Sequence, residues 1–211
     1  MLDKILLYYQ DNVSNYWEAV STHITLSLQV VIISIIIGVP LGILCAKYEK
    51  TAKYVSGLVN FLRVVPSLAL MVILIPLMGI GKVTALVSLT VIAVPSIMIN
   101  TTAGYLSVEK TVMETAKGMG MSPMQSFIKV ETPLAFPLIL TGIRTSAVET
   151  VASTCIAAYI GAGGLGDLVF AGLGMNRTEI VLLGGVSIAI FSVAIDIILA
   201  IYQAHISRYM N

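Results

Sequence analysis

Five long apolar runs dominate the chain, and each is long enough to form a transmembrane helix. They cover residues 24–46, 55–78, 83–106, 134–160 and 180–204. A helix needs about 20 apolar residues to cross the roughly 30 Å hydrocarbon core of a bilayer. The first and third runs carry no charged side chain, and the others contain only Arg63, Arg144, Glu149 and Asp196. The pattern therefore predicts an all-α membrane protein with five spans.

Residues 1–20 have a different pattern, in which apolar side chains recur at helical steps of three and four. Leu6, Tyr9, Val13 and Trp17 lie on one face of such a helix, and charged and amide side chains lie on the other. A helix with aromatic residues on its apolar face suits the membrane interface. We therefore expect an interfacial N-terminal helix over 1–20, with a soluble amphipathic helix packed on the protein as the alternative.

Residues 108–133 form the one long segment that is neither a span nor a short turn. Its charged side chains surround three small residues, Ala116, Gly118 and Gly120. Small residues on a short helix let another surface approach closely. We expect this segment to leave the membrane as a compact, mostly helical loop on which another protein docks.

Composition and charge agree with a membrane protein and indicate its orientation. The chain is 57% hydrophobic and 11% charged, whereas soluble domains carry about 25% charged residues. A net charge of +1 without a basic run gives no sign of nucleic-acid binding. If the 108–133 loop is cytoplasmic, seven Lys and Arg residues of the loops lie inside and three lie outside, as the positive-inside rule favours. This predicts an N-terminus outside, a cytoplasmic C-terminus and a single domain over 1–211.

The spacing within the loop resembles a known motif. Glu114-Thr115-Ala116 is followed by three residues, Gly120, nine residues and Val130-Glu131-Thr132-Pro133. This resembles the EAA loop of bacterial ABC-importer permeases, with Thr115, Val130 and Thr132 as conservative departures. The resemblance implies a type I ABC-importer permease fold in the bacterial cell membrane, whose cytoplasmic coupling helix sits in a groove of a separate ATPase subunit. The coupling residues that it implies are Glu114, Ala116, Lys117, Gly118, Met119, Gly120, Met121 and Pro133.

A second resemblance narrows the substrate. Segments 63–81, 115–123, 142–153 and 160–173 resemble the permeases of osmoprotectant importers, which carry quaternary ammonium compounds such as glycine betaine, choline and carnitine. A permease for methionine or another small solute is the alternative within the class. An ion channel or a membrane scaffold without an ATPase is the alternative from a different class.

Neither an enzyme nor a cofactor site is expected in this chain. His23 and His205 lie at opposite ends of the sequence, and the glycine run from Gly161 to Gly166 lacks the Lys-Ser/Thr of a phosphate-binding loop. No metal site is predicted. ATP and Mg²⁺ are therefore expected to bind to a partner ATPase dimer. The other partners implied are a second permease, either a copy of this chain or a related one, and an extracellular substrate-binding protein.

Polar and proline residues inside the spans are candidates for a translocation path. They are Arg63, Pro66, Ser67, Asn100, Arg144 and Glu149. Arg144 and Glu149 are about 140° apart on a helix of 3.6 residues per turn, so each is expected to find a partner on another helix. An Arg63–Asp196 or Arg63–Glu149 pair is one possibility, and a charge pair that only holds helices together is the alternative.

Two further features of the sequence are a glycine-rich stretch, which has two interpretations, and a pair of cysteines, which has one. The glycine-rich stretch with Gly163, Gly164, Gly166 and Asp167 suits a rim for receptor docking, or equally a turn that lets helices pack closely. Cys45 and Cys155 each lie inside an apolar run. We interpret these cysteines as small core residues that form no disulfide.

Overall fold

The computed structural model describes residues 2–48, 52, 55, 57, 59, 61, 62 and 64–208, with residues 206–208 described by their backbone alone. In this part of the chain the regular elements are all helices, joined by short turns. The α-helices are α1 (Leu2–Asp11), α2 (Val13–Lys47), α4 (Ser67–Met78), α5 (Lys82–Leu106), α6 (Lys110–Gly118), α7 (Pro123–Ser126), α8 (Thr132–Ala157), α9 (Leu165–Gly174) and α10 (Thr178–Arg208). A π-helix, Phe127–Glu131, precedes α8, and a 3₁₀ turn, Ala158–Ile160, follows it. The predicted all-α class is confirmed.

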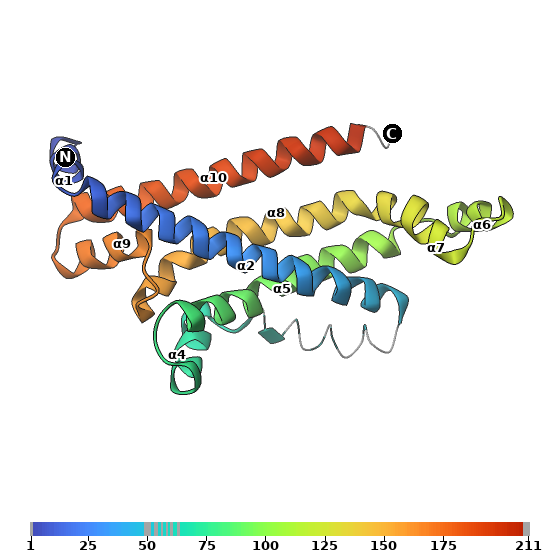
Figure 1. The fold of residues 1–211 in the computed structure, drawn as a ribbon, viewed down its shortest axis with the longest axis horizontal. Helices are drawn as coiled ribbons and strands as arrows, with labels where there is room; N and C mark the ends of the chain where they lie inside the picture. Colours follow the sequence, from blue (N-terminus) through green and yellow to red (C-terminus); the bar gives the residue numbers. More distant parts are fainter. Residues whose placement is uncertain are drawn as a thin grey trace.

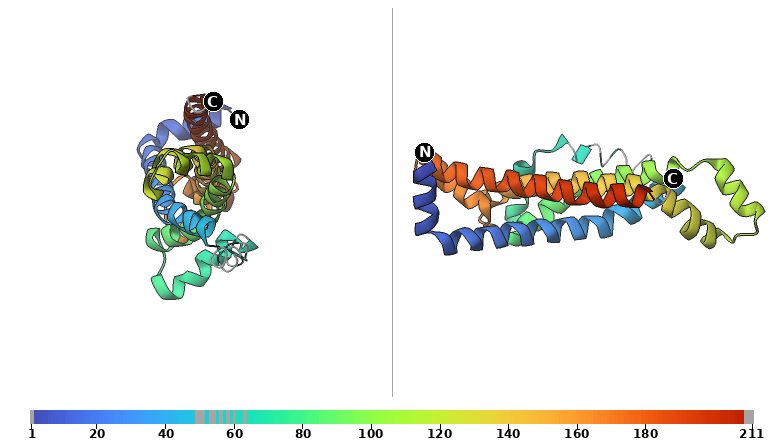
Figure 2. Two further views of the ribbon diagram at one scale, coloured as in Figure 1. Left: turned by 90° about the vertical axis from the view of Figure 1, so that its right-hand side faces the viewer. Right: turned by 90° about the horizontal axis from the view of Figure 1, so that it is seen from above.

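Four long helices, α2, α5, α8 and α10, run along the same axis and form the bundle (Figure 1). The helices α6 and α7 project beyond one end of the bundle, which we call the loop end. The helices α1 and α9 lie at the opposite end, which we call the distal end, and the chain begins there (Figures 1 and 2). The two ends of the chain therefore lie toward opposite ends of the bundle.

Glycines allow α5 to lie at the centre of the bundle, packed closely against both α2 and α8. A Cβ atom placed on Gly42 of α2 would lie 2.5 Å from Cβ of Thr101. A Cβ atom on Gly142 of α8 would lie 2.7 Å from Cβ of Asn100. Any side chain at these two crossings would force the helices apart. These close contacts fix the orientation of α5 and α8 relative to each other, and therefore the directions in which their polar side chains point.

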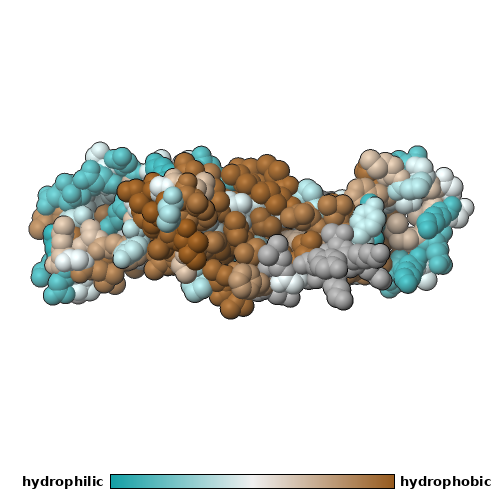
Figure 3. Space-filling view, turned by 90° about the horizontal axis from the view of Figure 1, so that it is seen from below, coloured by the Kyte–Doolittle hydropathy of each residue, from teal (hydrophilic) through white to brown (hydrophobic). Residues whose placement is uncertain are grey.

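Four helices in the described part of the chain are long and apolar enough to cross a membrane. They correspond to four of the five predicted spans. The predicted span over 55–78 lies partly outside the described residues, and α4 alone has only 12 residues. The space-filling view shows a hydrophobic middle between more hydrophilic ends, as expected for a bilayer-spanning protein (Figure 3).

The N-terminal region differs from the single helix expected over residues 1–20. The helix α1 ends at Asp11, and α2 begins at Val13 and continues into the bundle. At the break, Asn12 leaves helical geometry, and its side-chain amide donates to the carbonyl of Tyr8 at 3.1 Å. The helix α1 lies across the distal end of the bundle (Figure 2). Its placement in the membrane interface stays a prediction.

The two cysteines are free thiols in separate clusters. Cys45 is buried with Val59 and Met98. Cys155 is half-buried beside the cluster that contains Val151 and Leu165. The prediction of two unpaired core cysteines is confirmed.

Candidate functional site

Gly120 ends the first helix of the 108–133 loop. Its backbone has a φ of 78°, in the left-handed region. The amide of Gly120 donates to the carbonyl of Lys117 at 2.9 Å, and the amide of Met121 donates to that of Ala116 at 3.2 Å. These two bonds form a Schellman motif, which glycine favours because it has no Cβ. The motif glycine therefore has a structural task in shaping the loop.

The second half of the loop begins with a capping box that the sequence analysis missed. The Ser122 hydroxyl accepts from the amide of Gln125 at 3.3 Å, and the Gln125 side chain accepts from the amide of Ser122 at 2.9 Å. Pro123 occupies the first turn of α7. The pattern Ser-Pro-x-Gln is a recognisable helix start. It orients α7 so that the chain returns to α8 through the π-helix.

The candidate coupling residues occupy different environments. Glu114, Lys117, Gly118, Met119, Gly120 and Pro133 are exposed, and Met121 is half-buried. Ala116, in contrast, is only 1% exposed. Ala116 is thus covered by its own chain, and its contact with a partner stays a prediction. The exposed methionines Met119 and Met124 supply adaptable apolar surface beyond the end of the bundle.

An aromatic junction joins this loop to the bundle. The ring of Phe127 in the π-helix stacks on Tyr105 at the end of α5, with centroids 5.7 Å apart. The Lys47 ammonium, at the end of α2, lies 4.0 Å from the centroid of the Phe127 ring. The Tyr105 hydroxyl lies 2.9 Å from Oγ1 of Thr132, the first residue of α8. Three long helices thus meet the loop at Phe127.

Polar side chains of α5 and α8 meet on one face of the bundle. The Ser96 hydroxyl donates to Oε2 of Glu149 at 2.9 Å. One helical turn further along α5, the Asn100 side chain donates to the Ser96 carbonyl at 2.8 Å. Glu149 and Thr145 are exposed on a single chain although both lie within a spanning helix. Two predicted path residues, Asn100 and Glu149, are therefore brought together.

Arg144 turns toward a different helix, as its angular separation from Glu149 predicts. Its guanidinium donates two hydrogen bonds to Asp196 of α10, at 2.5 and 2.8 Å. Asp196 is thus bound to Arg144, and an additional pairing of Arg63 with Asp196 or Glu149 stays a prediction. Arg63 itself lies outside the described residues. Arg144 thus serves α8–α10 packing.

The remaining path candidates stand at the start of α4. Pro66 is exposed at the N-cap of this helix, and Ser67 is its half-buried first residue. The helix α4 packs on α5 and, less extensively, on α8. Pro66 and Ser67 therefore lie at the start of α4, beside the two helices that carry Asn100 and Glu149.

The glycine-rich stretch at the distal end is mainly a close-packing device. A Cβ atom on Gly166 would lie 2.1 Å from the carbonyl oxygen of Cys155, and one on Gly164 would lie 3.3 Å from the His23 ring. Both glycines are buried, whereas Gly163 is half-buried and Asp167 is exposed. Desolvation raises the pKa of the Asp167 carboxyl above its ordinary value. Gly163 and Asp167 are the more accessible of the four residues, and a docking rim at this stretch stays a prediction.

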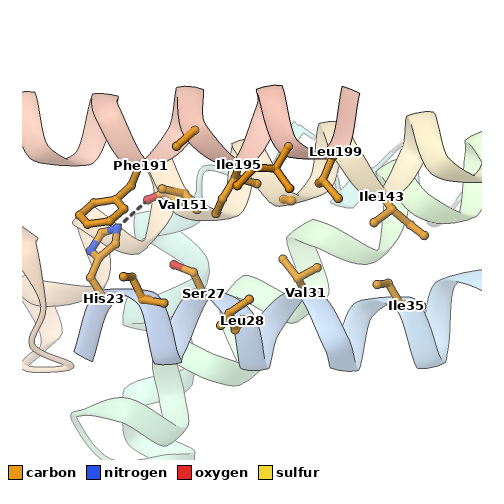
Figure 4. Close-up of a pocket in the computed structure, with 14 residues that line it drawn as sticks. His23, Ser27, Leu28, Val31, Ile35, Ile143, Val151, Phe191, Ile195 and Leu199 are labelled. Carbon is orange, nitrogen blue, oxygen red and sulfur yellow. Dashed lines mark hydrogen bonds between the residues drawn. The ribbon is translucent and has the colours of Figure 1, made fainter. Parts of the chain in front are cut away.

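An apolar cavity of about 550 Å³ lies between α2, α8 and α10 (Figure 4). Val31, Ile143, Ile195 and Leu199 point into it from the three helices, and at one end Nε2 of His23 lies 3.0 Å from the Val151 carbonyl oxygen. This lining offers almost no polar group to a small solute. In the described part of the chain, no three His, Cys, Asp or Glu side chains are grouped as metal ligands.

Comparisons with known proteins agree with this geometry. Residues 38–210 match the protein family described as binding-protein-dependent transport system inner membrane component. The chain is 39% identical over 199 residues to the choline transport system permease protein OpuBB of Bacillus subtilis, covering 94% of this chain and 92% of the relative. It is 38% identical to the carnitine transport permease protein OpuCB of Listeria monocytogenes, covering 92% and 89%. The fold is similar to that of a chain of the inward-facing MetNI methionine ABC transporter, with a TM-score of 0.83, 24% identity and coverage of 91% and 96%.

Proposed function

The chain belongs to the family of inner-membrane components of binding-protein-dependent transport systems, and on this premise we propose that it is the permease subunit of an ATP-driven importer for quaternary ammonium osmoprotectants. Glycine betaine, carnitine and choline are the substrates proposed, in line with the names of the relatives. The observation that carries the proposal is the 108–133 loop, which combines the EAA spacing with an exposed helix projecting beyond the bundle.

We propose that the loop end faces the cytoplasm. The N-terminus then lies outside and the C-terminus inside, and residues 55–78 supply the fifth span. The excess of Lys and Arg residues at the loop end supports this orientation. A partner ATPase dimer binds ATP and Mg²⁺ and docks on Glu114, Lys117, Gly118, Met119, Gly120 and Met121. Pro133 lies behind this surface, where the loop enters α8.

Transport follows from alternating access between two permease subunits. The Ser96, Asn100 and Glu149 face of one chain meets a second permease, and the two faces enclose the path, with Pro66 and Ser67 at its margins. Arg63, outside the described residues, stays a candidate for the path, and Arg144 supports it from behind by holding α8 to α10. ATP binding closes the ATPase pair and pulls on both coupling helices. The two bundles then tilt between inward-open and outward-open states. A substrate-loaded binding protein docks at the distal end, near Gly163 and Asp167.

Uptake of radiolabelled substrates tests the function. Cells that express this chain with its ATPase and binding protein should accumulate glycine betaine, choline or carnitine, and cells lacking only this chain should not. Methionine serves as the comparison substrate because this chain is similar in fold to a chain of a methionine transporter. Loss of methionine uptake alone would exclude an osmoprotectant permease.

A bulky side chain at Gly118 tests the docking of the ATPase. This residue ends α6 in helical geometry, and a Cβ atom there meets nothing within 4 Å in the chain. Gly118→Trp should therefore fold normally but weaken ATPase binding and uptake at least tenfold, whereas Gly118→Ala should behave like the wild type. Gly120 is the poorer choice because its positive φ would strain any replacement. If the chain were a channel or a scaffold without an ATPase, Gly118→Trp would leave its activity unchanged.

A further inference from the structure

One side of α8 exposes side chains at intervals along the outer half of the helix and in the 3₁₀ turn that follows, with the half-buried Ile156 between them. The exposed members of this stripe are Thr145, Glu149, Ala152 and Tyr159, at steps of four, three and seven residues. Residues at such steps lie above one another on the same side of a helix. The stripe therefore links the polar face in the membrane with the distal end of the bundle.

Glu149 is a carboxylate exposed on this stripe, within a membrane-spanning helix. An ionisable group at this depth is costly unless it lines a wet cavity or meets an opposite charge. Its described hydrogen bond comes from the neutral hydroxyl of Ser96. The nearest basic residue on its own helix, Arg144, is already bound to Asp196 by both carboxylate oxygens. Among the described residues, the ion pairs are Arg144–Asp196 and Arg177–Glu179, so the exposed Glu149 carboxylate has no basic partner in this part of the chain.

An aromatic pair stands at the distal end of the same stripe. The Tyr159 and Phe170 rings have centroids 5.7 Å apart and planes inclined by 59°. Tyr159 is 65% exposed, so its ring is accessible from outside the chain. At rises of about 1.5 Å per residue in α8 and about 2 Å in the 3₁₀ turn, Tyr159 lies about 16 Å along the axis from Glu149. Aromatic faces attract quaternary ammonium groups through cation–π contacts.

We propose that this stripe is a cation-recognition track for the quaternary ammonium group of the substrate. Tyr159 and Phe170 receive the trimethylammonium head at the outer mouth, and Glu149 supplies the opposite charge further in. The inference rests on the proposed function and adds a selectivity to it. Choline carries a net charge of +1, whereas glycine betaine has its own carboxylate, so Glu149 favours passage of choline over glycine betaine.

Two variants of Glu149 separate its charge from its shape. Glu149→Gln keeps the size and an acceptor for Ser96 but removes the charge, whereas Glu149→Asp keeps the charge. The measurement is initial uptake of choline and glycine betaine into proteoliposomes containing the whole transporter, with saturating binding protein. We expect Glu149→Gln to lose choline uptake by about tenfold or more, the scale of one hydrogen bond to a charged group. Glycine betaine uptake should fall several-fold less, and Glu149→Asp should retain most of both.

The outcomes distinguish this inference from the proposed function. A wild-type transporter that carries neither compound would overturn the proposed function itself. Wild-type uptake by Glu149→Gln, or an equal loss for both substrates, would overturn only the cation track, since a structural role affects both alike. If the wild type carries a single one of the two compounds, retention by Glu149→Asp together with loss by Glu149→Gln supports the track, and equal behaviour of the two variants contradicts it.

The aromatic end is tested by a matched pair at Tyr159. Tyr159→Phe keeps the ring face, and Tyr159→Leu keeps a bulky apolar side chain without it. We expect Tyr159→Leu to lower uptake about three- to tenfold, as for a cation–π contact that is partly shielded from water, while Tyr159→Phe stays near the wild type. Equal uptake by the wild type and Tyr159→Leu, or equal damage in both variants, would contradict a role of the ring. Size-exclusion chromatography of each complex verifies that assembly is unchanged.

Discussion

Gly166 of α9 and Gly185 of α10 are both glycines within helices, but only the first has no space for a side chain. A Cβ atom on Gly166 would lie 2.1 Å from the Cys155 carbonyl oxygen, whereas one on Gly185 meets nothing within 4 Å. We expect Gly166→Ala to cost about 1–3 kcal/mol, the usual range for overpacking, and Gly185→Ala to be neutral. Thermal denaturation of the two purified variants measures the difference. Equal melting temperatures would show that α9 does not pack on α8 as described.

The Arg144–Asp196 pair predicts a different pattern of loss and recovery. Asp196→Asn leaves the guanidinium within the membrane without its counter-charge and should reduce the amount of folded permease in the membrane. Exchanging the two residues, Arg144→Asp with Asp196→Arg, should restore part of that amount because the pair is re-formed. Fluorescence-detected size-exclusion chromatography gives the measurement. If the double variant is no better than Asp196→Asn, the pair does not hold α8 to α10.

For single residues, the sequence predicts the side of a helix on which a side chain lies better than it predicts the residue that the side chain contacts. The five-residue separation correctly placed Arg144 and Glu149 on different sides of α8. The partner of Arg144 could not be identified, because Asp196 follows 52 residues later and only the packing of α10 brings it near. Ala116 shows the same limit, since a small residue suits a partner surface and a buried position equally well. Tyr159 and Phe170 meet only because the glycine turn folds α9 back onto α8.

Among the elements, the 108–133 loop is predicted best by its sequence. Motif spacing marks where it begins and ends, and the Ser122 and Gln125 capping box is readable from the chain. The break at Asn12 is not predictable in this way, because the apolar period of residues 1–20 continues through it. The π-helix at Phe127–Glu131 leaves no local signal either. It arises where the loop must rejoin α8 while Phe127 stacks on Tyr105.

The junction at Phe127 predicts how the loop passes its motion to the bundle. Phe127→Ala removes the stack on Tyr105 and the cation–π contact with Lys47, contacts worth about 0.5–2 kcal/mol each. We expect the ATPase to bind normally, but the number of substrate molecules carried per ATP to fall several-fold. Ile128→Ala is the control, because this neighbouring side chain is exposed. Uptake and ATP hydrolysis are measured together in proteoliposomes.

Two outcomes would contradict a linking role for this junction. An unchanged ratio of uptake to hydrolysis in Phe127→Ala would mean that motion reaches the bundle elsewhere. Loss of ATPase binding in Phe127→Ala would mean that the residue supports the shape of the loop itself. Pull-down of the ATPase with each variant separates the second outcome from an uncoupled complex.

For the whole molecule, the described surface within the membrane has an apolar part on α2 and α10 and a polar part on α8. Large apolar side chains such as Ile32, Ile36, Ile190 and Ile198 are exposed on α2 and α10 and suit contact with lipid. The face of α8 with Thr145, Glu149 and Ala152 suits lipid poorly because it exposes a carboxylate. A second permease that covers this face would remove the mismatch. The polar face is therefore where the molecule is incomplete as a single chain.

Photo-cross-linking in membranes tests this division. A benzophenone amino acid in place of Ala152, on the polar face, should form an adduct with another permease chain, because a protein surface lies within reach there. The same amino acid in place of Val193, which is 57% exposed on α10, should meet lipid and form no protein adduct. The mass of the Ala152 adduct tells whether the neighbour is a copy of this chain or a related permease. Protein adducts from Val193 alone would place the second permease on α10 and leave Glu149 facing lipid, a position that its charge does not suit.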